Sequence, residues 1–220
     1  MFSFLKRKKK LDGDGERVDI NYYKMRYENF DMYQKSHYHR YKFAQNYIKN
    51  TDVVGDFACG SGYGTMMLAE KAKQVIGVDL NEDVVNYISD RYAKEKKVSF
   101  TANDLLNLEY DELLDVIVSF ETVEHLTEEN IVKLFSRYHK ALKKGGRIIF
   151  STPYNQEESE AAIKMGFHLT FYIVEETVQR WMKNAGFEIE TMKYQNYQEH
   201  EVCDFLEKKV FIICIGKKNN

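Results

Sequence analysis

Apolar and polar positions follow two different rhythms along this chain of 220 residues. Between Tyr27 and Ile48 apolar residues recur every three or four positions, which is typical of an amphipathic helical region packed on a core. We predict one or two helices there, with Ser36 as the N-cap of the second. After Asn50 short β-branched runs alternate with helical stretches, and this alternation is typical of a parallel sheet with helices on both faces.

The alternation predicts the following elements in order. Strands are expected at 53–58, 75–80, 98–102, 114–120 and 147–152. Helices are expected at 66–73, 83–96, 131–142 and 174–185. Two further strand-like runs, 187–194 and 210–216, follow Gly186 and can close the sheet as a hairpin. The fold class expected is therefore α/β: a doubly wound, Rossmann-like, mostly parallel seven-stranded sheet preceded by a helical arm.

The chain is expected to divide into a basic, flexible tail (1–20), the helical arm (21–50) and one α/β domain (51–220). Five consecutive basic residues, Lys6 to Lys10, have no apolar stretch after them, so they do not read as a signal peptide. A solvated tail is the first interpretation, and weak contact with an anionic membrane surface is the alternative. No apolar run reaches the length of a membrane helix.

Charge and cysteine content narrow the class of protein. Thirty-two basic and 34 acidic residues give a net charge of −2, without the basic excess of a dedicated nucleic-acid binder. The three cysteines fit neither a disulfide framework nor a zinc-ligand spacing. We therefore expect a cytoplasmic protein whose partner is not nucleic acid.

A glycine-rich turn, with Gly60, Gly62 and Gly64 at every second position, lies between the first predicted strand and the first helix after it. Glycine there permits a tight turn and the close approach of a ligand. Asp79 ends the next strand about 20 residues past Gly60, where an acid can accept hydrogen bonds from both hydroxyls of a ribose. Its alternative role is to cap the following helix.

A third polar point, Asp104 followed by Leu105, comes at the end of the third predicted strand. There the Asp104 carboxylate can accept a hydrogen bond from a purine amine, and Leu105 can pack on the purine ring. These three points fit a nicotinamide-dependent dehydrogenase and a methyltransferase equally well.

The order of motifs resembles class I S-adenosylmethionine-dependent methyltransferases over about residues 50 to 190. The stretches that carry the resemblance are Val53 to Thr65, Asp79, Asp104-Leu105, Asp115 to Leu126, and Leu142 to Pro153. The resemblance implies S-adenosylmethionine as cofactor and an antiparallel last strand. It implies cofactor contacts from Asp56, Cys59, Gly60 and Gly62 at the methionine end, Asp79 and Leu80 near the ribose, Asp104 and Leu105 at the adenine, and Phe120 and Glu121 near the sulfonium.

The flanking segments, Ser36 to Ala44 and Phe167 to Tyr172, resemble bacterial methyltransferases associated with surface-glycan synthesis, although the acid that often precedes His37 in them is missing. This resemblance implies O-methylation of a sugar or glycan-linked acceptor. Acceptor-binding residues are then expected at His37, His39, Arg40, Tyr41, His168 and Tyr172. The arm is expected to fold over the cofactor site, and its alternative is a helix on the far side of the sheet.

A sugar hydroxyl has a high pKa and benefits from a base. His125, assisted by Glu124, is the catalytic candidate. No metal is expected, because Glu121 and Glu124 are the only carboxylates that stand out at this point of the sequence. A methyltransferase for another small molecule, such as an amine or a quinone precursor, and a non-catalytic assembly partner remain as alternatives.

Overall fold

The computed structural model describes residues 18–159 and 168–219. The predicted basic tail up to residue 17 lies outside this part of the chain, and so does Phe167 of the predicted flanking segment. Among the described helices, none has both the length and the apolar character that crossing a bilayer requires.

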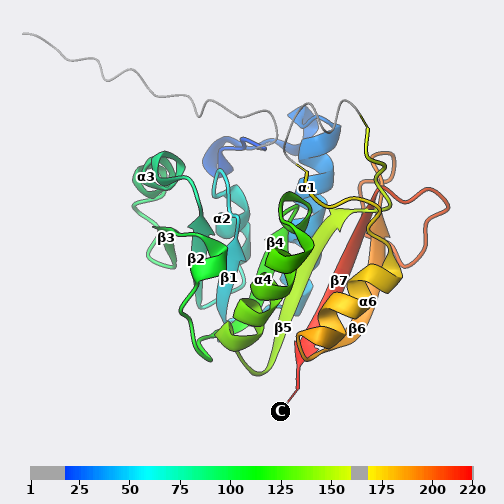
Figure 1. Ribbon diagram of the computed structural model, residues 1–220. Coiled ribbons are helices and arrows are strands. Elements are labelled where there is room, and N and C mark those ends of the chain that lie inside the picture. The colour runs from blue at the N-terminus through cyan, green and yellow to red at the C-terminus, as the bar shows by residue number, and fades with distance from the viewer. Residues whose placement is uncertain (1–17, 160–167, 220) are drawn as a thin grey trace, which may run out of the picture.

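A seven-stranded sheet with the order β3-β2-β1-β4-β5-β7-β6 forms the centre of the molecule (Figure 1). Its strands are β1 Val53–Phe57, β2 Gln74–Asp79, β3 Val98–Ala102, β4 Leu114–Phe120, β5 Leu142–Pro153, β6 Phe187–Gln195 and β7 Phe211–Lys218. The first five strands pair in parallel, whereas β7 runs antiparallel to both β5 and β6. The predicted doubly wound sheet and its closing hairpin are therefore confirmed.

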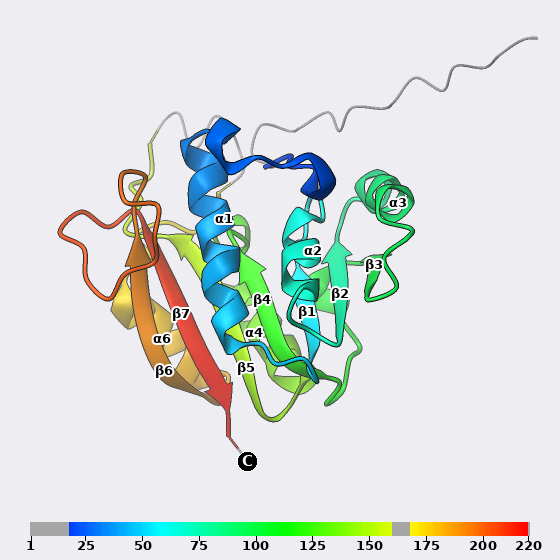
Figure 2. The same ribbon diagram turned by 180° about the vertical axis from the view of Figure 1, so that it is seen from behind.

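Helices cover both faces of the sheet. They are α1 Met32–Ala44, α2 Tyr63–Ala69, α3 Glu82–Arg91, α4 Glu128–Ala141 and α6 Glu175–Asn184. Figures 1 and 2 show α1 and α2 on one face, α4 and α6 on the other, and α3 at the β3 edge. Short 3-10 turns complete the chain at Tyr22–Lys24, Tyr27–Asn29, Gln45–Tyr47, Leu105–Asn107 and Val123–His125.

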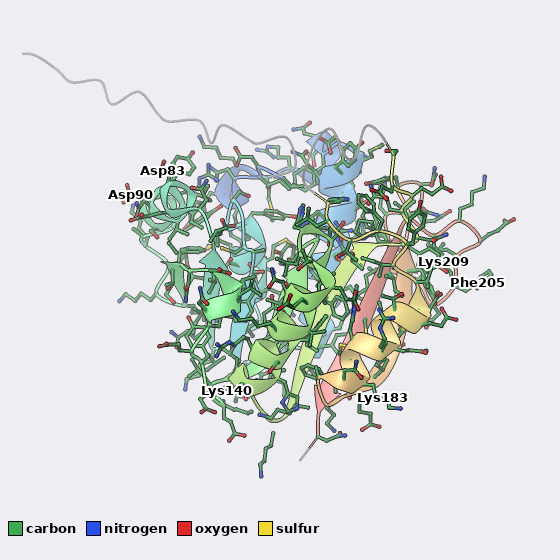
Figure 3. The ribbon with its side chains drawn as sticks, in the orientation of Figure 1. Asp83, Asp90, Lys140, Lys183, Phe205 and Lys209 are labelled. Carbon is green, nitrogen blue, oxygen red and sulfur yellow. The ribbon has the colours of Figure 1, made fainter. Side chains whose placement is uncertain are left out.

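Each face has its own hydrophobic core. Trp181 and Phe135 are almost fully buried between α4, α6 and the sheet, and their ring centroids lie 6.2 Å apart. On the opposite face α1 and α2 enclose Tyr41, Met67 and Leu68. Charged side chains lie on the outer surfaces, as Asp83, Asp90, Lys140 and Lys183 do in Figure 3. The polar and apolar rhythm of the sequence therefore corresponds to the two sides of α3, α4 and α6.

The arm contains one α-helix preceded by two 3-10 turns, so the prediction of Ser36 as a cap is wrong. Asp31 is the N-cap: its carboxylate accepts from the Gln34 amide at 2.8 Å, and the Gln34 side chain accepts from the Asp31 amide at 3.2 Å. Ser36 lies inside the helix, where its hydroxyl donates to the Met32 carbonyl at 2.9 Å. The reciprocal capping box outcompetes Ser36 because it satisfies two backbone donors together.

The contacts of the arm begin before the predicted boundary at residue 21. Ser61 of the glycine turn donates its hydroxyl to the Val18 carbonyl at 2.9 Å, and Ile20 is buried. The Tyr22 amide donates to the Tyr92 hydroxyl at 3.2 Å. Residues from Val18 onwards therefore lie against the glycine turn and are held there by hydrogen bonds.

Tyr41 joins α1 to the sheet and to α2. A Cβ added to Gly64 would lie 1.9 Å from the Tyr41 ring, so the helices approach closely only because residue 64 is glycine. The Tyr41 hydroxyl donates to one oxygen of Asp56 at 3.0 Å, and Thr65 donates to the other at 2.6 Å. Burial raises the pKa of Asp56 to about 6, although both hydroxyl contacts act in the opposite direction.

Replacing Gly64 with alanine is expected to destabilise the fold even though alanine favours a helix. Overpacking a core costs about 1–3 kcal/mol, and the helix propensity of alanine returns up to about 1 kcal/mol. Urea unfolding of Gly64→Ala should therefore give a lower free energy of unfolding. In a Tyr41→Ala background the same change should be neutral or stabilising, and an equal loss in both backgrounds would contradict this packing.

The raised pKa of Asp56 predicts a pH-dependent stability. Above pH 3.8 the unfolded chain ionises this group while the folded chain keeps it protonated up to about pH 6, so stability falls as pH rises through this window. Each pH unit costs up to about 1.4 kcal/mol. Relative to wild type, Asp56→Asn should thus gain on the order of 2 kcal/mol between pH 4 and 6.5. Denaturant unfolding at several pH values measures this, with exposed Asp83→Asn as control, and a pH-independent difference would argue against it.

Candidate functional site

The glycine turn leaves the carboxyl end of β1 and begins α2. Ala58, Gly60 and Gly62 have φ values of 62°, 52° and 72°, all in the left-handed region that suits glycine. The Cys59 amide donates to the Val78 carbonyl at 3.0 Å, which ties the turn to β2. Because Gly62 is the residue before α2, the helix begins at Tyr63, three residues earlier than predicted. Cys59 is buried, and burial raises the pKa of its thiol.

Asp79, at the end of β2, lies beside this turn. One carboxylate oxygen accepts from the Gly60 amide at 2.9 Å and the other from the Asn81 amide at 3.0 Å. The N-cap of α3 is Asn81, which accepts from the Val84 amide at 3.1 Å. Asp79 therefore does not cap α3, and its role in binding a ribose stays a prediction.

Asp104 and Leu105 follow β3 at the same edge of the sheet. Asp104 accepts from the Leu106 amide at 2.9 Å and begins the 3-10 turn that contains Leu105. Leu80, directly after β2, is 74% exposed, whereas Leu105 is partly buried. The residues predicted for the ribose and adenine thus follow neighbouring parallel strands, because β2 pairs with β3 from Val75↔Val98 to Asp79↔Ala102.

The arm brings three of its four predicted acceptor residues to one face of α1. The Tyr41 ring lies 5.0 Å from the Phe120 ring, and the His37 ring lies 6.4 Å from it, measured between centroids. Nδ1 of His37 lies 2.5 Å from the Tyr63 hydroxyl. His39 is not part of this group: its Nε2 lies 2.7 Å from the Tyr27 hydroxyl, on another side of the helix. Burial, and then the nearby Arg40, lower the pKa of His37 well below its usual value, which leaves it neutral.

Arg40 is buried between the arm, β7 and the end of β4. Its Nη1 donates to the Gln195 side chain at 3.1 Å and lies 3.6 Å from a Glu121 carboxylate oxygen. The guanidinium stacks on the Phe211 ring at 4.3 Å, and Nε has no hydrogen-bond partner among the described residues. Arg40 therefore pairs with a neighbouring acid, Glu121, in this structure.

Glu121 begins the turn after β4, with a φ of 50°. Its carboxylate accepts from the Ser151 hydroxyl at 2.6 Å, and its amide donates to the Ser151 carbonyl at 3.1 Å. A non-glycine residue keeps such a strained φ only where its surroundings hold it there. Ser151 holds Glu121 through these two hydrogen bonds.

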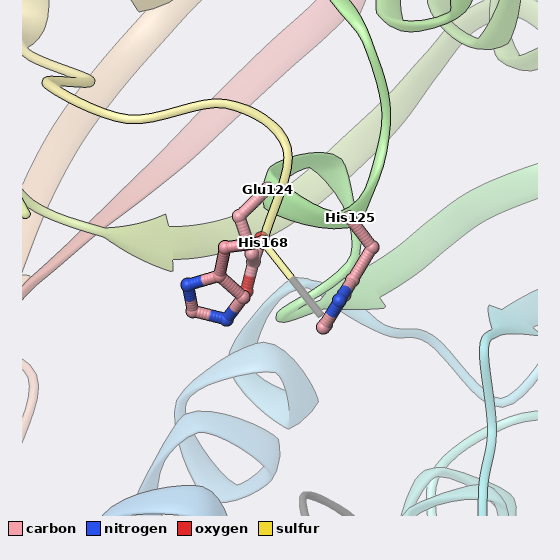
Figure 4. A group of neighbouring side chains, drawn as sticks. All are labelled: Glu124, His125 and His168. Atoms are coloured by element: carbon pink, nitrogen blue, oxygen red, sulfur yellow. The ribbon is translucent and has the colours of Figure 1, made fainter. Parts of the chain in front are cut away.

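Glu124, His125 and His168 meet just past β4 (Figure 4). One possible ligand atom from each lies within 4.8 Å of the other two, and the two histidine rings are 5.0 Å apart between centroids. Glu124 is almost fully buried, and its carboxylate accepts from the Thr152 hydroxyl at 3.1 Å. Burial, and then the charge of Glu121, raise the pKa of Glu124 well above its usual value. Burial, and then His125, lower the pKa of His168.

Some residues of the site were not found from the sequence. Tyr63 immediately follows Gly62, so its place at the start of α2 could have been inferred. Gln195 and Gln156, which contact Arg40 and His168, carry no local signal. Of the predicted acceptor residues, Tyr172 is 53% exposed, and its amide donates to the Gln156 carbonyl at 3.0 Å.

Comparison with known proteins identifies the domain. Residues 54–146, from β1 into β5, match the family model of a methyltransferase domain. The chain is 36% identical over 115 residues to the phosphoethanolamine N-methyltransferase of Plasmodium falciparum, an alignment that covers 51% of this chain and 43% of that protein. It is 34% identical over 103 residues to a probable S-adenosylmethionine-dependent methyltransferase of Mycolicibacterium smegmatis, covering 46% of this chain and 38% of the relative. The chain thus spans less than half the length of these two relatives.

Solved structures of methyltransferases share the fold. The geranyl diphosphate C-methyltransferase of Streptomyces coelicolor, solved with Mg²⁺, geranyl diphosphate and S-adenosyl-L-homocysteine, superposes with a TM-score of 0.66 at 16% identity. That superposition covers 81% of this chain and 77% of the other. The glycine turn follows β1, Asp79 ends β2, and Asp104 follows β3. Residues 54–146 thus match a methyltransferase domain, and the proteins of similar sequence and fold support S-adenosylmethionine as its cofactor.

Proposed function

We propose that this protein transfers the methyl group of S-adenosylmethionine to a hydroxyl of a sugar or glycan-linked acceptor in the cytoplasm. The observation that carries the proposal is the group of Glu124, His125 and His168 at the carboxyl end of β4. It lies directly after Phe120 and Glu121, the residues assigned to the sulfonium end of the cofactor. In a doubly wound sheet ligands bind at the carboxyl ends of the strands, so cofactor and acceptor would meet here.

The transfer is a displacement at a carbon that the sulfonium already activates. The acceptor oxygen forms a bond to the methyl carbon, the carbon–sulfur bond breaks, and its electron pair remains on sulfur as S-adenosylhomocysteine is formed. The hydroxyl proton must go to a base, and alignment of the two reactants supplies much of the remaining acceleration. His125 is the proposed proton acceptor, with Glu124 beside it.

The arm is proposed to form one wall of the acceptor site. His37, Arg40 and Tyr41 lie on the side of α1 that contacts Phe120, Glu121 and Asp56. His168 and Tyr172 belong to the segment between β5 and α6. A cover made from both would exclude water and fix the acceptor before transfer.

An amine acceptor is the second candidate, and one comparison favours it. The relative from Plasmodium falciparum carries the name phosphoethanolamine N-methyltransferase. Glu121, which is partly exposed, could pair with a substrate ammonium group. An ammonium group loses its proton far more readily than a sugar hydroxyl does. The two candidate reactions therefore differ in how much they depend on His125 as a base.

Asp79 is expected to contribute directly to cofactor affinity. Each hydrogen bond to a charged group is worth about 1.5–3 kcal/mol, and the loss of one weakens binding by roughly tenfold or more. Asp79→Asn, which keeps the shape but not the charge, should bind S-adenosylhomocysteine at least tenfold more weakly in calorimetry. Asp83→Asn on exposed α3 is the control, and equal affinity in all three proteins would exclude the ribose role.

The proposed function is tested by incubating the protein with S-adenosylmethionine and separate acceptor sets, then detecting methylated products by mass spectrometry. Nucleotide-linked sugars and glycans should gain one methyl group, whereas methylation of phosphoethanolamine alone would establish the second candidate. His125→Ala should reduce turnover on a hydroxyl acceptor by about 10²- to 10⁴-fold with cofactor affinity unchanged. His139→Ala, on α4 and away from the site, should behave as wild type. Turnover at the wild-type rate in His125→Ala would remove this residue from the mechanism.

A further inference from the structure

The group formed by Glu124, His125 and His168 has the composition of a metal site. Two imidazoles and one carboxylate are a common ligand set for zinc and other first-row divalent ions. Two atoms bound to one ion at about 2.1 Å each lie at most about 4.2 Å apart. The observed limit of 4.8 Å between the ligand atoms therefore requires only a small side-chain adjustment. Figure 4 shows the three side chains converging on one region.

The backbone holds His168 at this position although it is distant from Glu124 in sequence. The amides of Leu169 and Thr170 both donate to the Glu124 carbonyl, at 2.7 and 3.1 Å. The Thr170 hydroxyl donates to the Leu126 carbonyl at 2.6 Å. Three hydrogen bonds thus attach the histidine-bearing segment to the turn that carries the other two side chains, which is the rigidity that a preorganised ligand set needs.

His168 also has the outer contact that orients a metal-binding histidine. Its Nδ1 lies 2.8 Å from Oε1 of Gln156. A carbonyl oxygen can only accept, so Nδ1 carries the proton and Nε2 carries the lone pair. Metal-bound histidines usually donate their second ring nitrogen to a carbonyl or carboxylate in this way.

The electrostatics of Glu124 favour a cation at the same place. The side chain is 1% exposed, and its carboxylate accepts from the Thr152 hydroxyl at 3.1 Å. A buried carboxylate is costly unless it is paired or bound to a metal, and a divalent ion between Glu124 and the two histidines would supply that partner.

We propose that Glu124, His125 and His168 bind one divalent first-row transition-metal ion, with Gln156 as the residue that orients His168. Three protein ligands leave at least one coordination position open, as in catalytic zinc sites. The hydroxyl oxygen of the acceptor can occupy that position, and a bound ion lowers the pKa of the hydroxyl group. In this arrangement His125 is a ligand in place of its role as the base, so the ion-bound hydroxyl gives its proton to solvent water before transfer. The proposal replaces the expectation of no metal from the sequence. The acceptor's part rests on the proposed function, whereas the ion-binding part does not.

The test uses the full chain, freed of metal by chelation and dialysis, and needs neither cofactor nor acceptor. Co²⁺ is titrated while the visible absorption is recorded, and Zn²⁺ is titrated by calorimetry. One ion should bind per chain with a dissociation constant in the micromolar range or below. His168→Ala should weaken binding at least 100-fold, and Gln156→Ala should weaken it about 10- to 100-fold.

His139→Ala removes a histidine of α4 outside the group and should leave ion binding unchanged. Thermal unfolding and S-adenosylhomocysteine affinity should be the same in His168→Ala and wild type, which separates loss of a ligand from loss of the fold. The proposal would be overturned if neither Co²⁺ nor Zn²⁺ binds at one ion per chain, or if His168→Ala binds them as tightly as wild type. Ion binding without methylation of any acceptor would leave this site standing and count against the proposed function alone.

Discussion

The buried carboxyl group of Asp56 is the point on which the cofactor side of the structure depends. It accepts one hydroxyl from Tyr41 of the arm and another from Thr65 of α2, at the end of the central strand β1. These two contacts connect the arm, β1 and α2. A buried polar group is tolerated only when it is satisfied, so the position of α1 and the position of the glycine turn are specified together. The close approach at Gly64 has the same effect in steric terms, because it leaves room for the Tyr41 ring and for little else.

A second junction, at the end of β4, organises the acceptor side. The Glu124 carbonyl accepts two amides from the segment after β5, while its side chain turns inward toward Thr152 and the two histidines. The Glu124 backbone thus positions the segment after β5, and the Glu124 side chain forms part of the group with the two histidines. Arg40 connects the two junctions. It belongs to the arm, and it contacts both Glu121 after β4 and Gln195 of β6. Whether the centre acts as a base or holds an ion, its geometry comes from these hydrogen bonds rather than from the neighbouring sequence.

Some differences between the expected and the observed arm follow from helix geometry. Residues 37, 40, 41 and 44 lie along one side of α1, whereas residue 39 is turned by about 200° from residue 37, because each residue advances by about 100°. The separation of His39 from the other predicted acceptor residues was therefore implicit in the helical prediction. The cap at Asp31 was also visible as an acid three residues before Gln34, but Ser36 competed with it because serine is equally common at helix starts.

The sequence by itself determined the alternation of strands and helices, the glycine turn between β1 and α2, and the placement of Asp79 and Asp104 at the ends of successive strands. These features are local: they depend on side-chain periodicity, on the backbone freedom of glycine and on the fact that parallel strands end at one edge. Only the tertiary structure decided that His168 meets Glu124 and His125, that Arg40 faces Glu121, and that residues from Val18 lie against Ser61. Those contacts join segments far apart in the chain. They depend on how the arm and the loop after β5 pack on a finished sheet, and no pattern within either segment specifies its partner.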